Sequence, residues 1–275
     1  MNKKRFLASS LLVFGLTTMY LRSSLAKVNI SKQKQINVDG VKDVQLNVAS
    51  ADIEIVPSDS ENMVISLAGK ENKCIQDNVT LQVKEQAGKV NINYKIGHPI
   101  LSIIDGSKYE TKMRVEIPHG KVDALQVHAS SGDISVKDIL CSEISTHSTS
   151  GDQRFTKTHA SKGLNASAGS GDIVVENIES NKATFQTNSG DVTFNVEQLK
   201  MDLAFTTTSG DVVAKFGQIP SSMKVDFKGK SGQAFIQIDD LIFEEESKHR
   251  LLATKGAGDN EIKVRSKTGD FSLSV

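Results

Sequence analysis

Flat aromatic side chains are scarce in this chain. Its 275 residues include no tryptophan and only three tyrosines, at positions 20, 94 and 109. Sugar-binding clefts and base-stacking surfaces rely on such rings, so this scarcity disfavours both kinds of site. An excess of one charge is lacking too, because 33 lysines and arginines balance 33 aspartates and glutamates. A neutral chain has no bulk charge to attract nucleic acid, and we expect no nucleic-acid partner.

Cysteine is nearly absent as well: Cys74 and Cys141 are the only two. In an exported protein they could form one disulfide. Cys141 falls on an apolar repeat position, so a buried, unreactive thiol is at least as good a prediction. The chain also lacks HExxH, GxSxG and CxxC motifs and a glycine-rich phosphate loop. We therefore expect no catalytic residue, no cofactor and no resident metal.

The N-terminus has the features of an export signal. Lys3-Lys4-Arg5 precedes an apolar run over residues 6–21, and small residues follow up to Ala26. This order is typical of a secretory signal peptide cleaved after Ala26. The run of about 16 residues is shorter than the roughly 20 that span a bilayer, although an uncleaved signal anchor and a buried helix remain alternatives. We predict an exported protein (periplasmic, cell-surface or extracellular), which a retained segment 1–26 would tether to a membrane.

A Ser-Gly-Asp motif recurs through the middle of the chain. Alternating apolar and polar residues flank each copy, as Leu203 and Phe205 precede one copy and Val212 and Ala214 follow it. Alternation at period two around a glycine predicts two short strands per repeat, each with one buried face. The repeat around residue 152 is the weakest, because Thr146 and Gln153 stand at its apolar positions. The gaps between the motif aspartates are 19, 20, 19 and 20 residues: Asp133, Asp152, Asp172, Asp191 and Asp211.

A fixed period of about 20 residues predicts an all-β, single-domain β-solenoid, a stack of rungs. Neighbouring rungs would lie about 4.8 Å apart, which gives a rod on the order of 45 Å long. A β-sandwich of hairpins is the alternative, but it fits the long-period identity of the corners less well. The same template finds four further anchors, namely Asp52, Lys89, Gln233 and Asp270. Two longer gaps between them could each hide a degenerate rung, marked by Ala68-Gly69 and Gly258-Asp259.

We predict that the solenoid domain spans residues 27–275. Its expected parts are irregular rungs at 36–120, regular rungs at 121–240, a charged excursion at 242–255 and a terminal rung at 256–275.

Two segments of this domain lack a regular rung pattern. Residues Phe243 to Ala253 fit a short helix and a charged excursion equally well, and Lys95 to Lys112 is expected to be a surface loop. The last strand, Phe271 to Val275, has no cap after it. An open strand edge invites pairing, so we expect weak self-association through this strand.

The corner motif has a structural interpretation and a chemical one. Glycine permits positive φ, and Ser and Asp side chains accept backbone hydrogen bonds, so the motif serves as a turn. A Ca²⁺ row is the alternative, because carboxylates stacked at about 4.8 Å repel by roughly 0.9 kcal/mol per pair in water. Each corner supplies one carboxylate, however, whereas Ca²⁺ takes six or more oxygen ligands. We favour the turn and expect no stoichiometric Ca²⁺.

Two other groupings could support chemistry. His128 and His147 lie five residues before their aspartates, so they should be outward neighbours, and a transition metal there needs a third ligand such as His159. Ordinary surface histidines are the favoured interpretation. A polysaccharide lyase or hydrolase would need clustered carboxylates with a basic residue, but the spread of aspartates over every corner argues against it. Its candidate residues are Asp133, Asp152 and Asp172 with Arg154.

The motifs together match a known pattern. Val115-Glu116-Ile117-Pro118 leads into the rungs, the corners repeat as SGD[IV]-x-[VF], and Gly256-Ala257-Gly258 precedes a final TGDFSLSV. In these features the chain resembles the bacterial "putative adhesin" domain family of unknown function, which includes the LiaG-like envelope proteins, over about residues 36–275. The resemblance implies a β-solenoid-like fold, an exported or membrane-anchored location and no established enzymatic activity. The corners at Ala51, Lys89 and Gln233 depart from the pattern, which puts in doubt any role that requires every corner.

We therefore expect an exported cell-envelope β-solenoid that acts as a non-catalytic binding, adhesin-like or scaffold module. Its partner would be an envelope protein or a glycan. The alternatives are a polysaccharide-active β-helix enzyme and a Ca²⁺-binding surface repeat protein.

Overall fold

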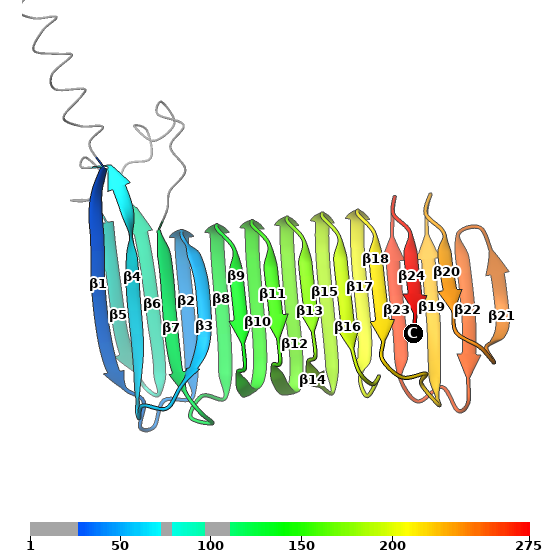
Figure 1. The fold of residues 1–275 in the computed structure, drawn as a ribbon, viewed down its shortest axis with the longest axis horizontal. Coiled ribbons are helices and arrows are strands. Elements are labelled where there is room, and N and C mark those ends of the chain that lie inside the picture. Colours follow the sequence, from blue (N-terminus) through cyan, green and yellow to red (C-terminus); the bar gives the residue numbers. More distant parts are fainter. Residues whose placement is uncertain (1–26, 73–78, 97–110) are drawn as a thin grey trace, which may run out of the picture.

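The computed structural model describes residues 27–72, 79–96 and 111–275, which form one rod of β-strands (Figure 1). Two sheets run along the rod, one of 11 strands and one of 13. Strands of neighbouring rungs pair in parallel and in register, as Val192 and Val212 do in one sheet and Ala183 and Leu203 in the other. The predicted β-solenoid is confirmed. Among these residues there is no helix of the length and hydropathy that crossing a membrane requires.

Eight rungs form the body of the rod. Each rung contributes one strand to each of the two sheets, and a corner joins the two strands. A two-residue strand, β14 (Glu179–Ser180), extends one rung along β12. The rungs are β2 (Asp43–Ser50) with β3 (Asp52–Ser58), β8 (Ala124–Ser131) with β9 (Ile134–Lys137), β10 (Leu140–Ser150) with β11 (Gln153–Thr156), β12 (His159–Ser170) with β13 (Ile173–Glu176), β15 (Lys182–Ser189) with β16 (Val192–Val196), β17 (Asp202–Ser209) with β18 (Val212–Phe216), β23 (Glu261–Ser266) with β24 (Phe271–Ser274), and β19 (Met223–Gly229) with β20 (Ala234–Gln237).

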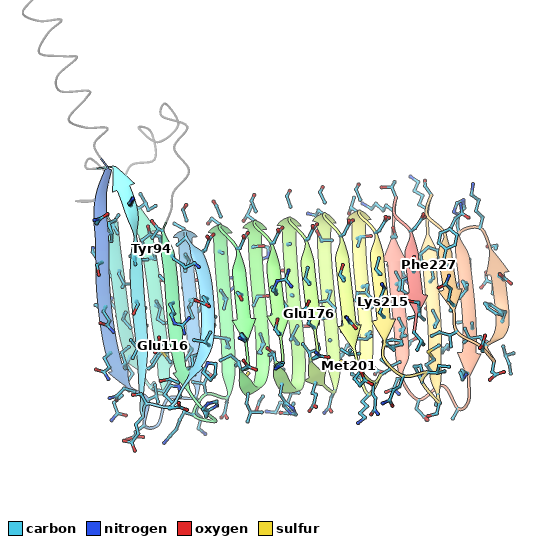
Figure 2. The ribbon with its side chains drawn as sticks, viewed as in Figure 1. Tyr94, Glu116, Glu176, Met201, Lys215 and Phe227 are labelled. Atoms are coloured by element: carbon cyan, nitrogen blue, oxygen red, sulfur yellow. The ribbon has the colours of Figure 1, made fainter. Side chains whose placement is uncertain are left out.

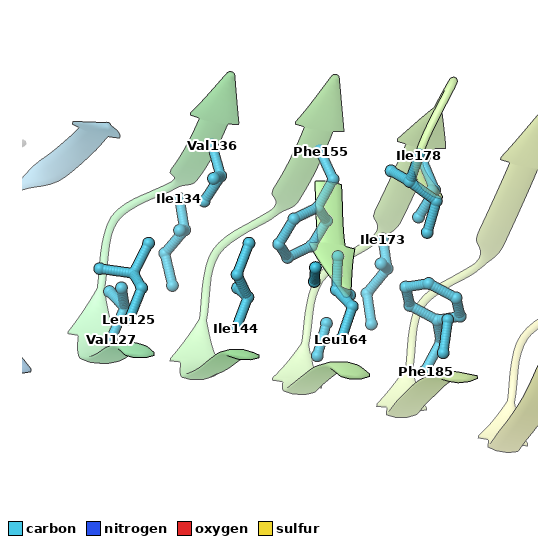
Figure 3. Close-up of a cluster of buried hydrophobic side chains, with 14 of the residues drawn as sticks. Leu125, Val127, Ile134, Val136, Ile144, Phe155, Leu164, Ile173, Ile178 and Phe185 are labelled. Carbon is cyan, nitrogen blue, oxygen red and sulfur yellow. The ribbon is translucent and has the colours of Figure 1, made fainter. Parts of the chain in front are cut away.

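The core lies between the two sheets, where inward side chains of successive rungs stack on one another. Figure 3 shows Leu125 and Ile134, from the two strands of one rung, turned into this space. Phe185 and Phe205 hold the same register position on β15 and β17, with ring centroids 5.6 Å apart. Burial of one such side chain contributes about 2 kcal/mol. The rungs therefore stabilise one another rather than themselves.

The rung of β10 and β11 places polar side chains in this core. Thr146 Oγ1 donates to Gln153 Oε1 over 2.5 Å, and both residues are buried. Gln153 Nε2 donates to Ser148 Oγ over 3.0 Å and to the Ser167 carbonyl over 2.6 Å. The buried amide is thus hydrogen-bonded at both ends, which is why this rung tolerates polar residues where its neighbours carry apolar ones.

At the N-terminal end the parallel stack gives way to antiparallel pairs. Ala87 and Gly88 have φ angles of 52° and 75°, as in a two-residue hairpin turn, and Lys89 begins the second strand of that hairpin. The predicted corner at Lys89 and the hidden rung at Ala68-Gly69 are therefore wrong. Hairpin strands share the period of two with solenoid strands, so alternation alone misled the assignment. The end strands are β1 (Lys27–Asn37), β4 (Asn62–Asn72) and β7 (Lys112–Pro118) in one sheet, and β5 (Val79–Gln86) and β6 (Lys89–Ile96) in the other.

The C-terminal end carries an antiparallel hairpin of β21 (Ile242–Ser247) and β22 (Arg250–Lys255). Leu251 and Ala253 are buried and alternate with less buried neighbours, which is a strand period. The helix alternative for this segment is therefore wrong. Gly256 and Gly258, with φ angles of 61° and 75°, lie in the turn that follows β22. The predicted hidden rung at 258–259 is also wrong.

The last rung in sequence is not the last rung in space. β24 pairs with β18 on one side and with β20 on the other, and β23 lies between β17 and β19. Figure 1 shows this red rung inserted beside the yellow and orange strands. The expected open edge at Phe271–Ser274 is therefore wrong, because both edges of β24 are already paired.

Several expectations lie outside the described residues. These are the export signal at 1–26, the thiol of Cys74 and most of the predicted loop from Lys95 to Lys112. The expected bounds of the domain and of its four parts stay predictions.

Candidate functional site

The corner aspartates form a continuous hydrogen-bonded column along the rod. In each rung Oδ1 of the aspartate accepts the backbone N–H of the corresponding residue in the next rung, over 2.8–3.1 Å. One oxygen of every carboxylate therefore satisfies the backbone of a neighbouring turn. The accepting carboxylates are, in spatial order, Asp52, Asp133, Asp152, Asp172, Asp191, Asp211 and Asp270, and the last of them accepts from the backbone N–H of Gln233.

The corner glycines stack in the same way. A Cβ added to Gly190 would lie 2.1 Å from the carbonyl oxygen of Gly171, and one on Gly210 would lie 1.9 Å from that of Gly190. Their φ angles are 153° and 154°, a region that favours glycine. Glycine is thus required by the close approach of the preceding rung as well as by φ.

This column explains two departures from the motif. Ala51 belongs to the first corner. A Cβ added to Gly132, in the second corner, would lie 2.2 Å from the Ala51 carbonyl oxygen, so the requirement for glycine begins at the second corner. Gln233 belongs to the last corner, which has no further rung whose backbone an aspartate could bind. The first corner therefore does without glycine and the last without aspartate.

The proposed lyase grouping does not assemble around Arg154. Its guanidinium instead contacts Glu176 at 3.4 Å, an exposed ion pair between adjacent rungs. The aspartates it would need, Asp133, Asp152 and Asp172, each hold the backbone of the next corner. In the part of the chain that the structure describes, no three His, Cys, Asp or Glu side chains are grouped to hold a metal ion. The expectation that Ca²⁺ does not bind stays a prediction.

The two histidines predicted as neighbours are neighbours. His128 and His147 face outward in register, with ring centroids 6.3 Å apart, and Nδ1 of His147 lies 2.8 Å from Ser167 Oγ. The third candidate ligand is not brought to them: His159 lies eight residues before Ser167 on the same strand, about 26 Å away. Its Nδ1 contacts Glu179 Oε2 at 3.0 Å.

Cys141 is buried and Asp226 is partly buried, and both have shifted pKa values. Burial raises the pKa of the Cys141 thiol to about 12, and Sγ donates to the Glu143 carbonyl over 3.4 Å. A thiol held neutral in this way is unreactive. Burial also raises the pKa of Asp226, but hydrogen bonds from Arg265 and Arg250 outweigh that effect, so its pKa lies below the usual value.

The second corner of the rungs changes form midway along the rod. Three successive rungs turn through a single residue of positive φ, namely Asp138 at 54°, Lys157 at 49° and Asn177 at 53°. In the next rung the equivalent residue is the buried Val196, which still belongs to β16, and residues 197–201 make a wider turn. The surface is therefore interrupted where a narrow corner meets a wide one.

A groove of about 540 Å³ lies at this change of corner. Met201, labelled in Figure 2, marks its position on the lower edge of the rod in that view. Side chains of both charges and three amides are exposed along it, above apolar side chains that are buried. The polar residues are His159, Ser161, Asn177, Glu179, Ser180, Asn181, Glu197, Gln198 and Lys200, and the apolar ones are Ile178, Val196 and Met201.

Hydrogen bonds hold several groove side chains in place. Gln218, from the next rung, donates through Nε2 to Glu197 Oε1 over 3.1 Å and accepts from Gln198 Nε2 over 2.6 Å. Sequence reasoning missed this site, because the anchor spacing of 19–20 residues is the same on both sides of it. The available signal was Val196, an apolar residue where the preceding rungs carry a polar turn residue.

The sequence of this chain matches a known protein family. Residues 41–215 and 137–274 match one family, described as Toastrack DUF4097, and the two ranges together take in most of the chain. The chain belongs to the Toastrack DUF4097 family. The resemblance drawn from the SGD corners and the TGDFSLSV ending is thereby confirmed.

Solved structures similar to this Toastrack chain share little sequence with it. A "putative adhesin" from Bacteroides fragilis is 11% identical, with a TM-score of 0.46 over 91% of this chain and 99% of its own. A "putative cell adhesion protein" from Clostridium sporogenes is 9% identical, with a TM-score of 0.42 over 90% and 99%. A "putative lipid binding protein" from Parabacteroides distasonis is 15% identical, with a TM-score of 0.35 over 87% and 96%. Among curated proteins none matches. These values are too low to carry an inference about a ligand.

Proposed function

We propose that this Toastrack chain is an exported, non-catalytic binding module of a bacterial envelope, and that the groove at the change of corner holds a polar segment of a partner protein. The groove carries the proposal. Its volume of about 540 Å³ falls in the range of ordinary ligand sites. It also interrupts an otherwise repetitive surface, so a ligand there would have one defined position.

The lining suits a peptide segment better than a sugar. Amides such as Asn181 and Gln198 both donate and accept, as peptide groups do, and Glu197 and Lys200 offer charges of opposite sign. No tryptophan exists in the chain to stack on a sugar ring.

The rungs support binding without large rearrangement. Groove residues come from neighbouring rungs whose strands are paired in register, as Leu164 with Ala183 and Ala183 with Leu203. A backbone held by such strands on both sides of the groove has little left to order when a ligand binds. The lyase and Ca²⁺-repeat alternatives have no comparable observation in their favour, since both need corner carboxylates that here hold the backbone.

The position of β1 supports a scaffold role. β1 begins at Lys27, at one end of the rod, and the residues before it would tether the protein at that end if they are retained (Figure 1). The groove would then face sideways, at a distance from the membrane set by the intervening rungs.

The proposal is tested by site-specific crosslinking in an envelope extract. A photoreactive residue replaces Gln198 in the groove or, as control, Lys215 on the exposed face of β18. We expect a discrete protein adduct from position 198 only, reduced about tenfold by Glu197→Lys, a loss typical of a removed interfacial contact. Protease treatment of the extract should abolish the adduct.

Three outcomes would overturn the proposal. An adduct that survives protease but not periodate oxidation of sugars would make the ligand a glycan. Equal labelling from both positions would mean that the groove is not a site. Shortened polysaccharide after incubation would make the chain an enzyme.

A further inference from the structure

The two ends of the rod are stepped in opposite senses. Beyond the first rung, β2 with β3, one sheet continues by three strands (β7, β4, β1) and the other by two (β6, β5). Beyond the last rung, β19 with β20, the first sheet stops and the second continues by two strands (β22, β21). The sheet that protrudes at one end is therefore the shorter one at the other end (Figure 1).

The C-terminal end exposes apolar side chains on unpaired strand edges. Phe235 on β20 is 51% exposed, and Ile242 and Phe243 on β21 are 72% and 45% exposed. Within residues 27–72, 79–96 and 111–275 these strands are the outermost members of their sheets, so each has one edge of backbone groups that no described strand pairs. Such an edge beside exposed apolar side chains is a surface on which another strand can add.

The same end is acidic. Five carboxylates lie between β20 and the end of β21, with no lysine or arginine among them until Lys248: Asp239, Asp240, Glu244, Glu245 and Glu246, all exposed. Two of them form ion pairs within the chain, Asp240 with Lys255 at 3.6 Å and Glu245 with Arg250 at 3.1 Å. The end therefore keeps a net negative charge, which disfavours contact between two copies of it.

The N-terminal end is basic and polar. Residues 31–35 of β1 are all exposed and include Lys32 and Lys34, and β5 adds Lys84 beside Glu85. Lys32 Nζ donates to the Val79 carbonyl over 2.7 Å, which ties β1 to β5 across the end of the rod. Lysines on an edge strand prevent pairing with most other strands. Carboxylates on an incoming strand would form favourable cross-strand pairs with these lysines.

We propose that this chain associates head to tail, with the C-terminal end of one copy (β20, residues 238–241 and β21) docked on the N-terminal end of the next (β1 and β5). The opposite charges, the opposed steps and the apolar edge of β20 all favour this pairing over contact between like ends. A contact of this kind joins two different surfaces and does not close on itself, so it builds linear chains of rods. The self-association expected from the sequence at β24 is thereby moved to the outermost strands of the rod, because β24 lies inside its sheet. This contact does not depend on what the groove binds.

The test uses two charge-reversed variants of the full chain. Asp239→Lys with Glu246→Lys makes both ends basic, and Lys34→Glu with Lys84→Glu makes both ends acidic. None of these four side chains is one that ties β1 to β5 or pairs with Lys255 or Arg250. The control, Lys162→Glu with Lys215→Glu, makes the same change in charge as the second variant, and of the same size but opposite sign to the first, on the flank of the rod.

Average mass is measured by light scattering against protein concentration at low salt. We expect wild type and the flank control to grow in mass, and each end variant to need about tenfold more protein for the same growth. An equimolar mixture of the two end variants should recover the wild-type curve, because each then offers a complementary end to the other. About 0.5 M salt should weaken growth in every case.

Other results would overturn the proposal. Wild type that stays monomeric at every concentration would do so directly. If the average mass of the end variants grows as that of wild type does, the contact lies elsewhere in the chain, for example in residues 1–26. A mixture that fails to recover growth would mean that the two ends do not meet each other.

Discussion

The backbone N–H of Asp191 donates to Oδ1 of Asp172 over 2.8 Å, so the side chain of one rung binds the turn of the next. Because the same bond recurs at every corner, the carboxylates form a structural column rather than separate sites. The corner aspartate recurs because every rung has to be joined to its neighbour.

Removing an interior corner carboxylate should destabilise the stack. We expect Asp172→Ala to lower the free energy of unfolding by about 1 kcal/mol, since it leaves the Asp191 N–H without its acceptor. Denaturant titration of the two proteins measures the difference. Gln233→Ala is the control and should have almost no effect, because that side chain serves no further rung. Equal losses from both substitutions would contradict the column.

A corner glycine should be harder to replace than a corner aspartate. Gly190→Ala should cost about 3 kcal/mol, because the new Cβ would lie 2.1 Å from the Gly171 carbonyl oxygen and that backbone has to move. The opposite change at the first corner, Ala51→Gly, should cost about 1 kcal/mol, the ordinary loss of backbone restriction. Thermal melting of both variants tests this order, and an equal shift in the two would show that rung spacing does not select glycine.

Asp226 should make stability depend on pH. Arg265 Nη2 donates to its Oδ2 over 2.5 Å and Arg250 donates to its Oδ1, so the folded-state pKa is lowered. The stabilisation is therefore present above the unfolded pKa of about 3.9 and is lost as pH falls through the folded value. We expect Asp226→Asn to cost about 2 kcal/mol at neutral pH. The difference from wild type should shrink below about pH 4, and a difference that does not change with pH would contradict this account.

Cys141 should resist thiol reagents while the protein is folded. Its thiol is buried and has a pKa of about 12, so little thiolate exists at neutral pH. In a Cys74→Ser background we expect labelling by an aromatic disulfide reagent to occur only after denaturation. Labelling of the native protein within minutes would show that the site opens readily. Mass spectrometry of the unreduced wild type separately reports whether the two cysteines pair.

The sequence by itself determined the rung: its length, its two strands, the inward face of each and the glycine-aspartate corner. These follow from contacts between residues close in the chain and from a spacing that repeats, and Phe185 and Phe205 stack as that spacing requires. It also marked the deviating corners at Ala51 and Gln233, although not the reason, and it wrongly counted the hairpin at Lys89 among them. The reason at Ala51 and Gln233 lies in their places as the first and last corners of the column.

Only the tertiary structure decided the order of the rungs and the form of both ends. Alternation at period two is the same in a rung and in a hairpin, so Lys89 and the segment around Leu251 could not be assigned from it. Many strands of similar pattern can pair with one another, and which pairs form depends on contacts far apart in sequence. That is why β24 lies inside its sheet, between Val212–Lys215 and Ala234–Gln237, while the groove and the two stepped ends appear only where the regular stack is interrupted.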